Sequence, residues 1–432
     1  MTINSTHDVG RKSWVSGANA EHADFPLQNL PHGVYQPVRG APRGCVAIGD
    51  QVLDMQAAVH AGLFAAGELS AAAAAAESQL NRLMGVDRPA FSALRVRLQA
   101  LLELNAPDRE RVEPCLIPLD QAQLCIPARP GAFTDFMTSA SHIAAERPAR
   151  QAGTVPACFW HLPIAYNSRA SSVTPSGQAV ERPHGQFSTD GGVEFGPTRA
   201  LDYELEFACF VGQGNPLGSP IRLDDSADHI FGYCILNDWS ARDIQLWESV
   251  LGPFQAKAFR TTISPWVVTY EAMAPFRQAM AERPSDAPQA PPHLYSDRNQ
   301  SAGGLGLRLQ AKIRTSEMRR AGSPAAVLTD TTLATAAWSF EQMLTHHAAG
   351  GCNLETSDLI SSGTLSGPEL SSAGCLLEIT GGRVPITLPN GERRLYLEDH
   401  DEVIISARAE RKGYASIGFG ECVAQVAPAV AW

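Results

Sequence analysis

Hydrophobic and polar positions alternate in short runs along most of the chain, and this pattern predicts many strands and few helices. From about residue 125 onward, apolar runs such as "HIFGYCILN", "LGLRLQAKI" and "DEVIISARAE" are separated by turn residues at irregular spacing. Runs of this length, bounded by Gly, Pro, Asn or Asp, are typical of strands. "CLLEIT" and "YASIGFGECVAQV" fit the same interpretation. The pattern therefore predicts a β-rich α+β fold.

Helical spacing is found in three places. A helix is expected from about residue 70 to 84, closed by Gly85, because the segment is rich in alanine and leucine. A second is expected within "PAFSALRVRLQALLELN", where apolar residues recur every three or four positions. A third is expected near 332–347, with Gly350 after its end.

The chain divides into three parts by the same patterns. Residues 1–20 are polar and are expected to form a mobile N-terminal segment. Residues 21–125 are expected to form a small mixed domain, which contains a hairpin over 45–55 with Gly49 and Asp50 as its turn. Residues 126–432 are expected to form the larger β-rich domain, after a proline-rich connector.

Composition narrows the classes of function. The chain has 432 residues, 44% hydrophobic and 18% charged, so it is globular and not disordered. Its net charge of −11 disfavours nucleic acid and anionic membranes as partners. The start lacks the apolar core of a signal peptide, and no run reaches the ~18 apolar residues of a membrane helix. We therefore expect a soluble, cytoplasmic protein.

The nine cysteines form no CxxC pair, so no zinc cluster or thioredoxin-type pair is indicated.

The segment "LDYELEF" is the first candidate for chemistry. Strand alternation places Asp202, Glu204 and Glu206 on one side, with the apolar residues on the other. One interpretation is an amphipathic strand with a solvated acidic face. The other is a site for a hard cation such as Ca²⁺ or Mg²⁺, which would relieve the repulsion between neighbouring carboxylates.

The segment "NDWSARDIQLW" has the pattern of a strand end, a turn and a helix start. Ser240 is expected to cap the helix, with Asp243 completing a capping box. Arg242 and Gln245 then share one helical face. That face is either a surface or a pair of donors directed at substrate oxygens.

A histidine and two acidic residues are further candidates. "TDFMTSASHIAAE" places Asp135 and His142 close in sequence, although a lone histidine is more often a packing or surface residue than a catalyst. Glu378 lies in the predicted strand "CLLEIT", where a carboxylate is costly unless it is paired. Glu378 is therefore a candidate partner for a histidine. "SGTLSGPE" is a glycine-rich turn that exposes Thr364.

Several long motifs occur together in a fixed order. They include "DFPLQNLPHGVY", "VAIGDQVLD", "DYELEFACFVGQGNPLG", "ILNDWSARDIQLWE", "GPFQAKAFRTTISPWVV" and "LTHHAAGGCNLETSDLISSGTLSGPE". Over nearly its whole length the chain resembles the fumarylacetoacetase family. The resemblance implies hydrolysis of the carbon–carbon bond of 4-fumarylacetoacetate to fumarate and acetoacetate, in tyrosine and phenylalanine breakdown. It also implies a small SH3-like N-terminal barrel, a β-rich catalytic domain and a homodimer. The alternative within the superfamily is an acylpyruvate or β-diketone hydrolase or decarboxylase.

The resemblance also implies roles for individual residues. The ligands of a Mg²⁺ or Ca²⁺ ion would be Asp135, Glu204, Glu206 and Asp238. His142 would be the base that activates water, with Glu378 orienting it. The residues that face substrate oxygens would be Arg242, Gln245 and Lys257, and those that line the pocket would be Tyr166, Thr364 and, where the family has a tyrosine, Met137. Lys257 and Thr261 match the surroundings of a second, structural Mg²⁺, and Arg150 matches an arginine that follows the catalytic histidine.

Three positions depart from the family pattern. Met137 stands where the family has a substrate-contacting tyrosine, two residues after the first metal aspartate. Ser249 stands near the position of a second tyrosine, and Arg260 stands where the family has glycine. All the residues that the resemblance assigns to the metal and to the base are present. The departures therefore concern recognition of the tail of the substrate.

Overall fold

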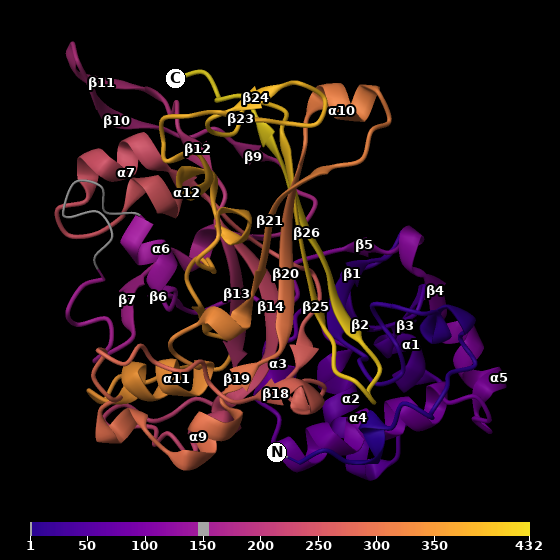
Figure 1. Ribbon diagram of the computed structural model, residues 1–432. Coiled ribbons are helices and arrows are strands. Elements are labelled where there is room, and N and C mark those ends of the chain that lie inside the picture. The colour runs from indigo at the N-terminus through magenta and orange to yellow at the C-terminus, as the bar shows by residue number, and fades with distance from the viewer. Residues whose placement is uncertain (1, 146–154) are drawn as a thin grey trace.

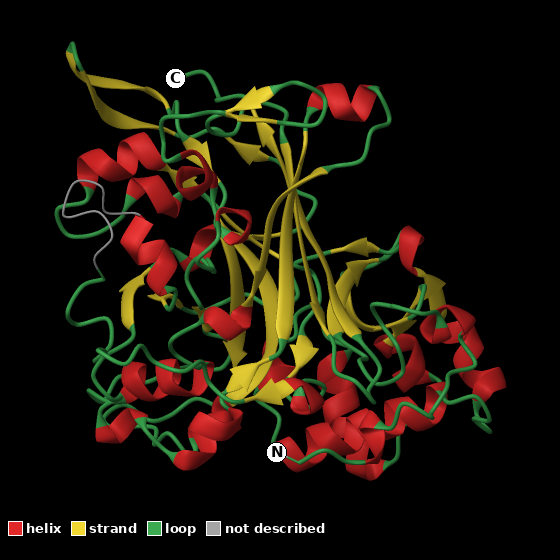
Figure 2. Cartoon of the chain, in the orientation of Figure 1, coloured by secondary structure: helices red, strands yellow, loops and turns green. Residues whose placement is uncertain are grey.

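The computed structural model describes residues 2–145 and 155–432. The N-terminal unit lies beside the rest of the chain, at the lower right of Figure 1. Long strands occupy the centre of the molecule, and most helices lie along its lower edge and its flank (Figure 2). The predicted β-rich α+β fold is confirmed. Within the described residues, no helix is both long and apolar enough to cross a membrane.

The N-terminal unit is built on a five-stranded antiparallel sheet in the order β4-β3-β2-β1-β5. Its strands are β1 (His32–Gln36), β2 (Arg43–Ile48), β3 (Gln51–Asp54), β4 (Leu116–Pro118) and β5 (Gln123–Leu124). The predicted hairpin is confirmed, since β2 and β3 pair antiparallel around Gly49, whose φ is +55°. A positive φ favours glycine at this turn.

Helices cover the N-terminal sheet: α1 (Met55–His60), α2 (Ala66–Ala75), α3 (Asn81–Met84), α4 (Arg88–Leu102) and α5 (Arg109–Val112). The second predicted helix is α4, which begins at the cap Asp87 and buries Phe91, Leu94, Leu98 and Leu101. The single helix expected over 70–84 is wrong, because α2 and α3 are separate. A Cβ at Gly44 would lie 1.8 Å from the carbonyl oxygen of Ala75, so β2 approaches the end of α2 closely.

Residues 2–20 contact other parts of the chain. Ser13 Oγ donates to the carbonyl of Leu102 at 2.6 Å, and Gln28 donates to the carbonyl of Arg11 at 3.0 Å. His7 is buried and contacts the carbonyl of Glu271 at 2.9 Å. The sequence pattern did not indicate these contacts because their partners lie far along the chain, and the mobility of the segment remains a prediction. The domain boundary near residue 125 remains a prediction.

Two large sheets form the rest of the chain. The first has eight strands, in the order β7-β6-β22-β13-β14-β16-β8 with β17 beside β14. Its strands are β6 (Phe133–Met137), β7 (Ile164–Asn167), β8 (Val173–Pro175), β13 (Leu205–Val211), β14 (Ile230–Asp238), β16 (Thr261–Ile263), β17 (Val268–Thr269) and β22 (Leu359–Ser361). The second sheet has the order β21-β20-β25-β26-β9. Its strands are β9 (Val180–Glu181), β20 (Leu307–Arg314), β21 (Ala326–Thr332), β25 (Glu402–Ala409) and β26 (Ile417–Ala427).

Strand β13 lies between two hydrophobic cores. Leu205, Phe207 and Cys209 belong to the larger core, which the second sheet also lines. Ala208 and Phe210 point the opposite way, into the core shared with the N-terminal unit. This alternation confirms that the apolar residues of "LDYELEF" share one face. Because both faces of β13 are covered, its acidic residues cannot lie on a solvated face.

The other helices are α6 (Ala140–Ala145), α7 (Arg242–Glu248), α8 (Gln255–Ala258), α9 (Asp297–Ala302), α10 (Ser316–Arg320), α11 (Phe340–Ala348) and α12 (Leu376–Thr380). Short two-stranded ladders pair β10 (His184–Thr189) with β11 (Gly192–Pro197), β12 (Leu201–Asp202) with β15 (Ser240–Ala241), β18 (Arg277–Gln278) with β19 (Gly304–Leu305), and β23 (Ile386–Thr387) with β24 (Arg393–Arg394).

Two predicted elements differ from the structure. The helix expected near 332–347 begins later, at Phe340, because Ser339 caps it and forms a capping box with Gln342. "CLLEIT" forms the helix α12 and not a strand. The amides of Leu376 and Leu377, in its first turn, donate to the carboxylate of Asp202 at 2.8 and 2.9 Å.

Candidate active site

Three carboxylates from three strands converge in the first sheet. Asp135 lies on β6, Glu206 on β13 and Asp238 at the end of β14, and one oxygen of each lies within 4.8 Å of the others. All three side chains are buried. Burial, followed by the charge of Asp238, raises the pKa of Asp135 to about 7. The cluster therefore crowds the negative charge of three carboxylates into one buried volume.

Glu206 shows that the cluster fits a cation. Both of its carboxylate oxygens are buried, and neither has a hydrogen-bond partner within residues 2–145 and 155–432. Burial, together with the nearby charges of Asp135 and Asp238, raises its pKa well above the ordinary value. An all-oxygen donor set of this kind suits Mg²⁺ or Ca²⁺, and a bound ion would remove the penalty of the unpaired charge.

Glu204 lies beside the cluster in a different environment. Its Oε1 is 2.8 Å from Lys257 Nζ and 2.7 Å from Arg242 Nη1, and its Oε2 accepts from Thr364 Oγ1 at 2.6 Å. Burial alone would raise the pKa of Glu204, but Lys257 and Arg242 hold it well below the ordinary value. Ser240 also donates to Glu204, at 2.6 Å, and so does not cap α7 as expected.

Asp238 is held by a cation and two hydroxyl groups. Lys257 Nζ lies 2.7 Å from Oδ2, Tyr166 donates to the same oxygen at 3.2 Å, and Thr261 donates to Oδ1 at 2.7 Å. Lys257 is only 4% exposed. The structure thus places four predicted site residues in one contact network, although they lie on different elements.

Arg242 and Gln245 share one face of α7, as the spacing predicts. Arg242 Nη1 donates to Gln245 Oε1 at 3.1 Å, and Arg242 Nε donates to Asp202 Oδ2 at 3.1 Å. Arg242 is buried, so this face is not a free surface. Asp243 does not form the expected capping box with Ser240, because its carboxylate accepts from Thr198 and from the amide of Arg199.

His142 and Glu378 form a buried pair. His142 Nδ1 lies 2.5 Å from Glu378 Oε1, and the two side chains are 1% and 5% exposed. Ser139 Oγ accepts from the amide of His142 at 3.2 Å, at the start of α6. Burial would raise the pKa of Glu378, but His142 and Ser366 hold it below its ordinary value. An ionised Glu378 therefore holds the proton of His142 on Nδ1.

A short hydroxyl-rich segment joins these groups. Ser361 donates to Asp135 at 2.5 Å, Thr364 donates to Glu204, and Ser366 donates to Glu378 at 2.8 Å. The segment passes close to β6 at Gly363, where φ is +69° and a Cβ would lie 1.9 Å from the carbonyl oxygen of Phe136. Thr364 was a candidate from the sequence, but Ser361 and Ser366 were not, although the run "SSGTLSG" places hydroxyl groups at all three positions.

The residues that depart from the family pattern make contacts of their own. Met137 is half-buried at the end of β6 and pairs with Ile164. The hydroxyl of Ser249 donates back to the carbonyl of Gln245, and Arg260 pairs with Glu181. Arg150 lies outside the described residues.

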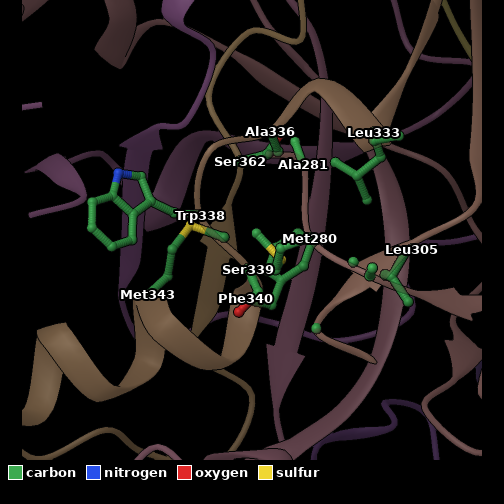
Figure 3. A pocket seen from close by; sticks show the side chains of 14 residues that line it. Met280, Ala281, Leu305, Leu333, Ala336, Trp338, Ser339, Phe340, Met343 and Ser362 are labelled. Carbon is green, nitrogen blue, oxygen red and sulfur yellow. The ribbon is translucent and has the colours of Figure 1, made fainter. Parts of the chain in front are cut away.

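A small cavity beside the start of α11 is a separate feature (Figure 3). Its lining is largely apolar and includes Met280, Trp338 and Phe340, with Ser339 and Ser362 as polar members. These residues carry no carboxylate or imidazole, so the cavity offers no acid or base chemistry.

Comparisons with known proteins identify the family of the chain. Residues 28–127 match the family described as "Fumarylacetoacetase N-terminal", and residues 134–427 match "Fumarylacetoacetate (FAA) hydrolase C-terminal". The chain is 40% identical to the fumarylacetoacetase of Oryza sativa subsp. japonica, over 97% of this chain and 98% of that protein. The chain belongs to the fumarylacetoacetase family.

Other fumarylacetoacetases are similarly related. The human fumarylacetoacetase is 40% identical over 95% of this chain and 98% of that protein. A solved structure, the fumarylacetoacetate hydrolase of psychrophilic Exiguobacterium antarcticum, has a TM-score of 0.51 and 17% identity, and covers 92% of this chain and 99% of that chain. That likeness concerns the fold alone.

Proposed function

We propose that the chain hydrolyses the carbon–carbon bond of 4-fumarylacetoacetate and releases fumarate and acetoacetate, a step of tyrosine and phenylalanine breakdown. Identity near 40% with fumarylacetoacetases over almost the whole chain supports this activity. The observation that carries the proposal is the segment 361–366, whose hydroxyls contact both the carboxylate cluster and the pair of His142 and Glu378. It holds a cation site and a general base next to each other.

Asp135, Glu206 and Asp238, with Glu204 beside them, are the residues that would hold a Mg²⁺ or Ca²⁺ ion. The unpartnered oxygens of Glu206 support this assignment. When bound, the ion would supply positive charge to the two oxygens of the β-diketone. The second, structural Mg²⁺ at Lys257 and Thr261 remains a prediction. In this structure the ammonium group of Lys257 itself compensates the charge of Asp238.

His142 is the base in this proposal. Glu378 holds the proton of Nδ1, so Nε2 is the nitrogen that takes a proton from water. The carboxylate also stabilises the imidazolium that then forms, as in other histidine–carboxylate pairs. Without Glu378 the ring could adopt the wrong tautomer.

Arg242, Gln245 and Lys257 are the donors that face the substrate oxygens. A buried ammonium or guanidinium group that is already in position stabilises developing negative charge without reorganisation. Asp202 and Glu204 fix the two cationic groups in place. Tyr166, Thr364 and Met137 line the substrate position in this assignment, and Arg150 remains a prediction.

The proposal also includes the shape of the N-terminal domain, the oligomeric state and the location in the cell. The five strands of the N-terminal sheet support an SH3-like barrel for the N-terminal domain. A homodimer and a cytoplasmic location are expected from the family.

The test is a turnover assay with 4-fumarylacetoacetate and an acylpyruvate in parallel, with and without a chelator. We expect fumarylacetoacetate to be cleaved faster, and the chelator to abolish turnover reversibly. Preference for the acylpyruvate would replace the proposed substrate by the superfamily alternative. Full turnover of protein that elemental analysis shows to be metal-free would reject the role of the cation.

A further inference from the structure

A cysteine lies against the proposed catalytic pair. Cys375 Sγ is 3.3 Å from Glu378 Oε1, the same oxygen that lies 2.5 Å from His142 Nδ1. One ligand atom of each residue lies within 4.8 Å of the others. Cys375 and His142 are buried, and Glu378 is nearly so. Three protein ligands of different types therefore converge on one small volume.

The local structure explains why these groups meet. Cys375 is the cap residue of α12, and Glu378 follows it by three positions, so both side chains lie at the start of this helix. Asp202 binds the first amides of α12 and fixes its orientation toward α6, which carries His142. The three residues lie 236 positions apart in sequence at most, which is why the absence of a CxxC pair did not exclude such a cluster.

The donor set differs from that of the carboxylate cluster. Imidazole nitrogen, thiolate sulfur and one carboxylate oxygen are ligands that Zn²⁺ prefers, whereas Mg²⁺ and Ca²⁺ prefer oxygen alone. A thiolate and a carboxylate carry two negative charges, which a divalent ion balances within a buried site. Within the described residues, this cluster and the carboxylate cluster are the two groups that could hold a metal ion.

We propose that His142, Cys375 and Glu378 form a second metal site, selective for Zn²⁺ and similar soft cations, that inhibits the enzyme. The ion takes the place of the proton between His142 Nδ1 and Glu378 Oε1, and that proton moves to Nε2 of the same ring. The ion also takes the place of the thiol proton of Cys375, which is released to solvent. Tetrahedral Zn²⁺ ligands lie about 2.0–2.3 Å from the metal, so small side-chain rotations suffice to open the 2.5 Å contact. With the ion on Nδ1 and a proton on Nε2, the ring has no free nitrogen to accept a proton from water. Binding is independent of the proposed function, and the inhibition rests on it.

Binding is tested with Co²⁺ as a spectroscopic substitute for Zn²⁺, added to protein saturated with Mg²⁺. The background protein carries Cys158→Ser and Cys352→Ser, since these two cysteines are exposed and could bind the metal adventitiously. We expect one equivalent of Co²⁺ to give a thiolate-to-cobalt absorption band. Cys375→Ser in the same background should abolish the band, and Cys234→Ser, which changes a buried cysteine in the apolar core, should keep it. Persistence of the band in the Cys375→Ser protein would overturn the proposal.

Inhibition is tested by titrating Zn²⁺ into the turnover assay at saturating Mg²⁺. Each protein is compared with its own rate without zinc. We expect Cys375→Ser to raise the inhibitory zinc concentration at least about tenfold, because a hydroxyl is a poor ligand for a soft cation. Equal inhibition of both proteins would reject the site. If Cys375→Ser does not fold, Cys375→Ala is used in its place.

The two experiments separate this proposal from the proposed function. A cobalt band that depends on Cys375, together with turnover that zinc does not affect, would support the metal site and contradict the role of His142 as base. An absent band in the background protein, with normal turnover of fumarylacetoacetate, would reject the metal site and leave the proposed function intact.

Discussion

Arg242 Nε donates to Asp202 Oδ2 at 3.1 Å, and both side chains are buried at 2% and 0% exposure. The carboxylate of Asp202 also accepts from the first two amides of α12, the helix that carries Glu378. Burial raises the pKa of Asp202, and Arg242 opposes this rise. One buried carboxylate thus orients both the proposed substrate-binding arginine and the helix of the proposed catalytic pair.

Asp202→Asn should therefore reduce activity although Asp202 does not touch the proposed substrate position. The amide has one acceptor oxygen where the carboxylate has two, so Arg242 or α12 loses its partner. We expect kcat/KM to fall about tenfold to a hundredfold through misplacement of Arg242 or of α12. The free energy of unfolding should fall by about 3 kcal/mol, because a buried ion pair is broken. Asp243→Asn, on the same helix as Arg242, is the matched control. Equal effects of the two variants would contradict the role of Asp202.

His142→Gln should abolish most activity without unfolding the protein. Glutamine keeps hydrogen-bonding groups near Glu378 but cannot accept a proton at neutral pH. We expect kcat to fall about 10²- to 10⁴-fold. His346→Gln, at the end of α11, should leave kcat unchanged. Near-native kcat in a folded, metal-binding His142→Gln protein would assign the base elsewhere.

Glu206→Gln should have opposite effects in the presence and absence of metal. The wild-type side chain is buried with both oxygens unpartnered within the described residues, and its pKa is raised mainly by burial. A neutral amide relieves this cost in metal-free protein, so its melting temperature should equal or exceed that of the wild type.

The same substitution should remove the stabilisation by Mg²⁺. A ligand at one hundred times its Kd stabilises a folded protein by about 2.7 kcal/mol, which the wild type should show and Glu206→Gln should lack. Glu194→Gln, an exposed carboxylate on β11, serves as the control. A metal-induced shift that survives in Glu206→Gln would argue that the ion binds elsewhere.

The sequence patterns predicted which side chains share one face of a strand. They did not predict which other elements of the chain bury that face. Alternation correctly placed the apolar residues around Glu206 on one face, but the solvated acidic face was one of two interpretations, and it is wrong. Whether that face is solvated depends on β6, β22 and the N-terminal unit, which lie far away in sequence. Glu378 was expected on a strand, because the side chain that accepts from the first amides of the helix is Asp202, which lies 174 residues before Leu376. Cys375 carried no signal, since His142 comes from another helix far away in sequence.

His32 should make the protein less stable in acid. The side chain is 2% exposed, and its ring lies 5.6 Å from that of Phe91. Burial, followed by the charge of Arg95, lowers its pKa to about 3. The folded state therefore binds a proton less readily than the unfolded state, whose histidine has a pKa of about 6.5. The stabilisation is complete above about pH 6.5 and is lost as the pH falls toward about 3.

The measurement is urea unfolding of wild type and His32→Gln at about pH 7 and about pH 4.5. In the wild type, His32 should lower the free energy of unfolding by about 3 kcal/mol between about pH 7 and about pH 4.5. His32→Gln should lack this contribution to the pH dependence. His60→Gln changes an exposed histidine at the end of α1 and should behave as the wild type. Identical acid sensitivity of wild type and His32→Gln would show that other groups dominate.

Met137 should determine how selectively the protein binds the terminal carboxylate of the substrate. It lies two residues after Asp135, at the end of β6, half-buried and opposite Ile164. A methionine fills irregular apolar space but cannot donate a hydrogen bond to a carboxylate. A phenol at this position could donate one, and a hydrogen bond to a charged group contributes about 1.5 kcal/mol or more. We therefore expect Met137→Tyr to lower KM for fumarylacetoacetate about tenfold with little change in kcat.

Met137→Phe separates the hydroxyl from the ring. It adds the same aromatic volume without the donor, so it should not lower KM, and any loss it causes reports crowding against Ile164. An analogue of fumarylacetoacetate without the terminal carboxylate completes the comparison. The wild type should tolerate this analogue, whereas Met137→Tyr should discriminate against it, because the phenol donor would then be left without a partner. Strong rejection of the analogue by the wild-type protein would mean that another residue already binds the carboxylate, and Met137 would then not be the determinant of specificity.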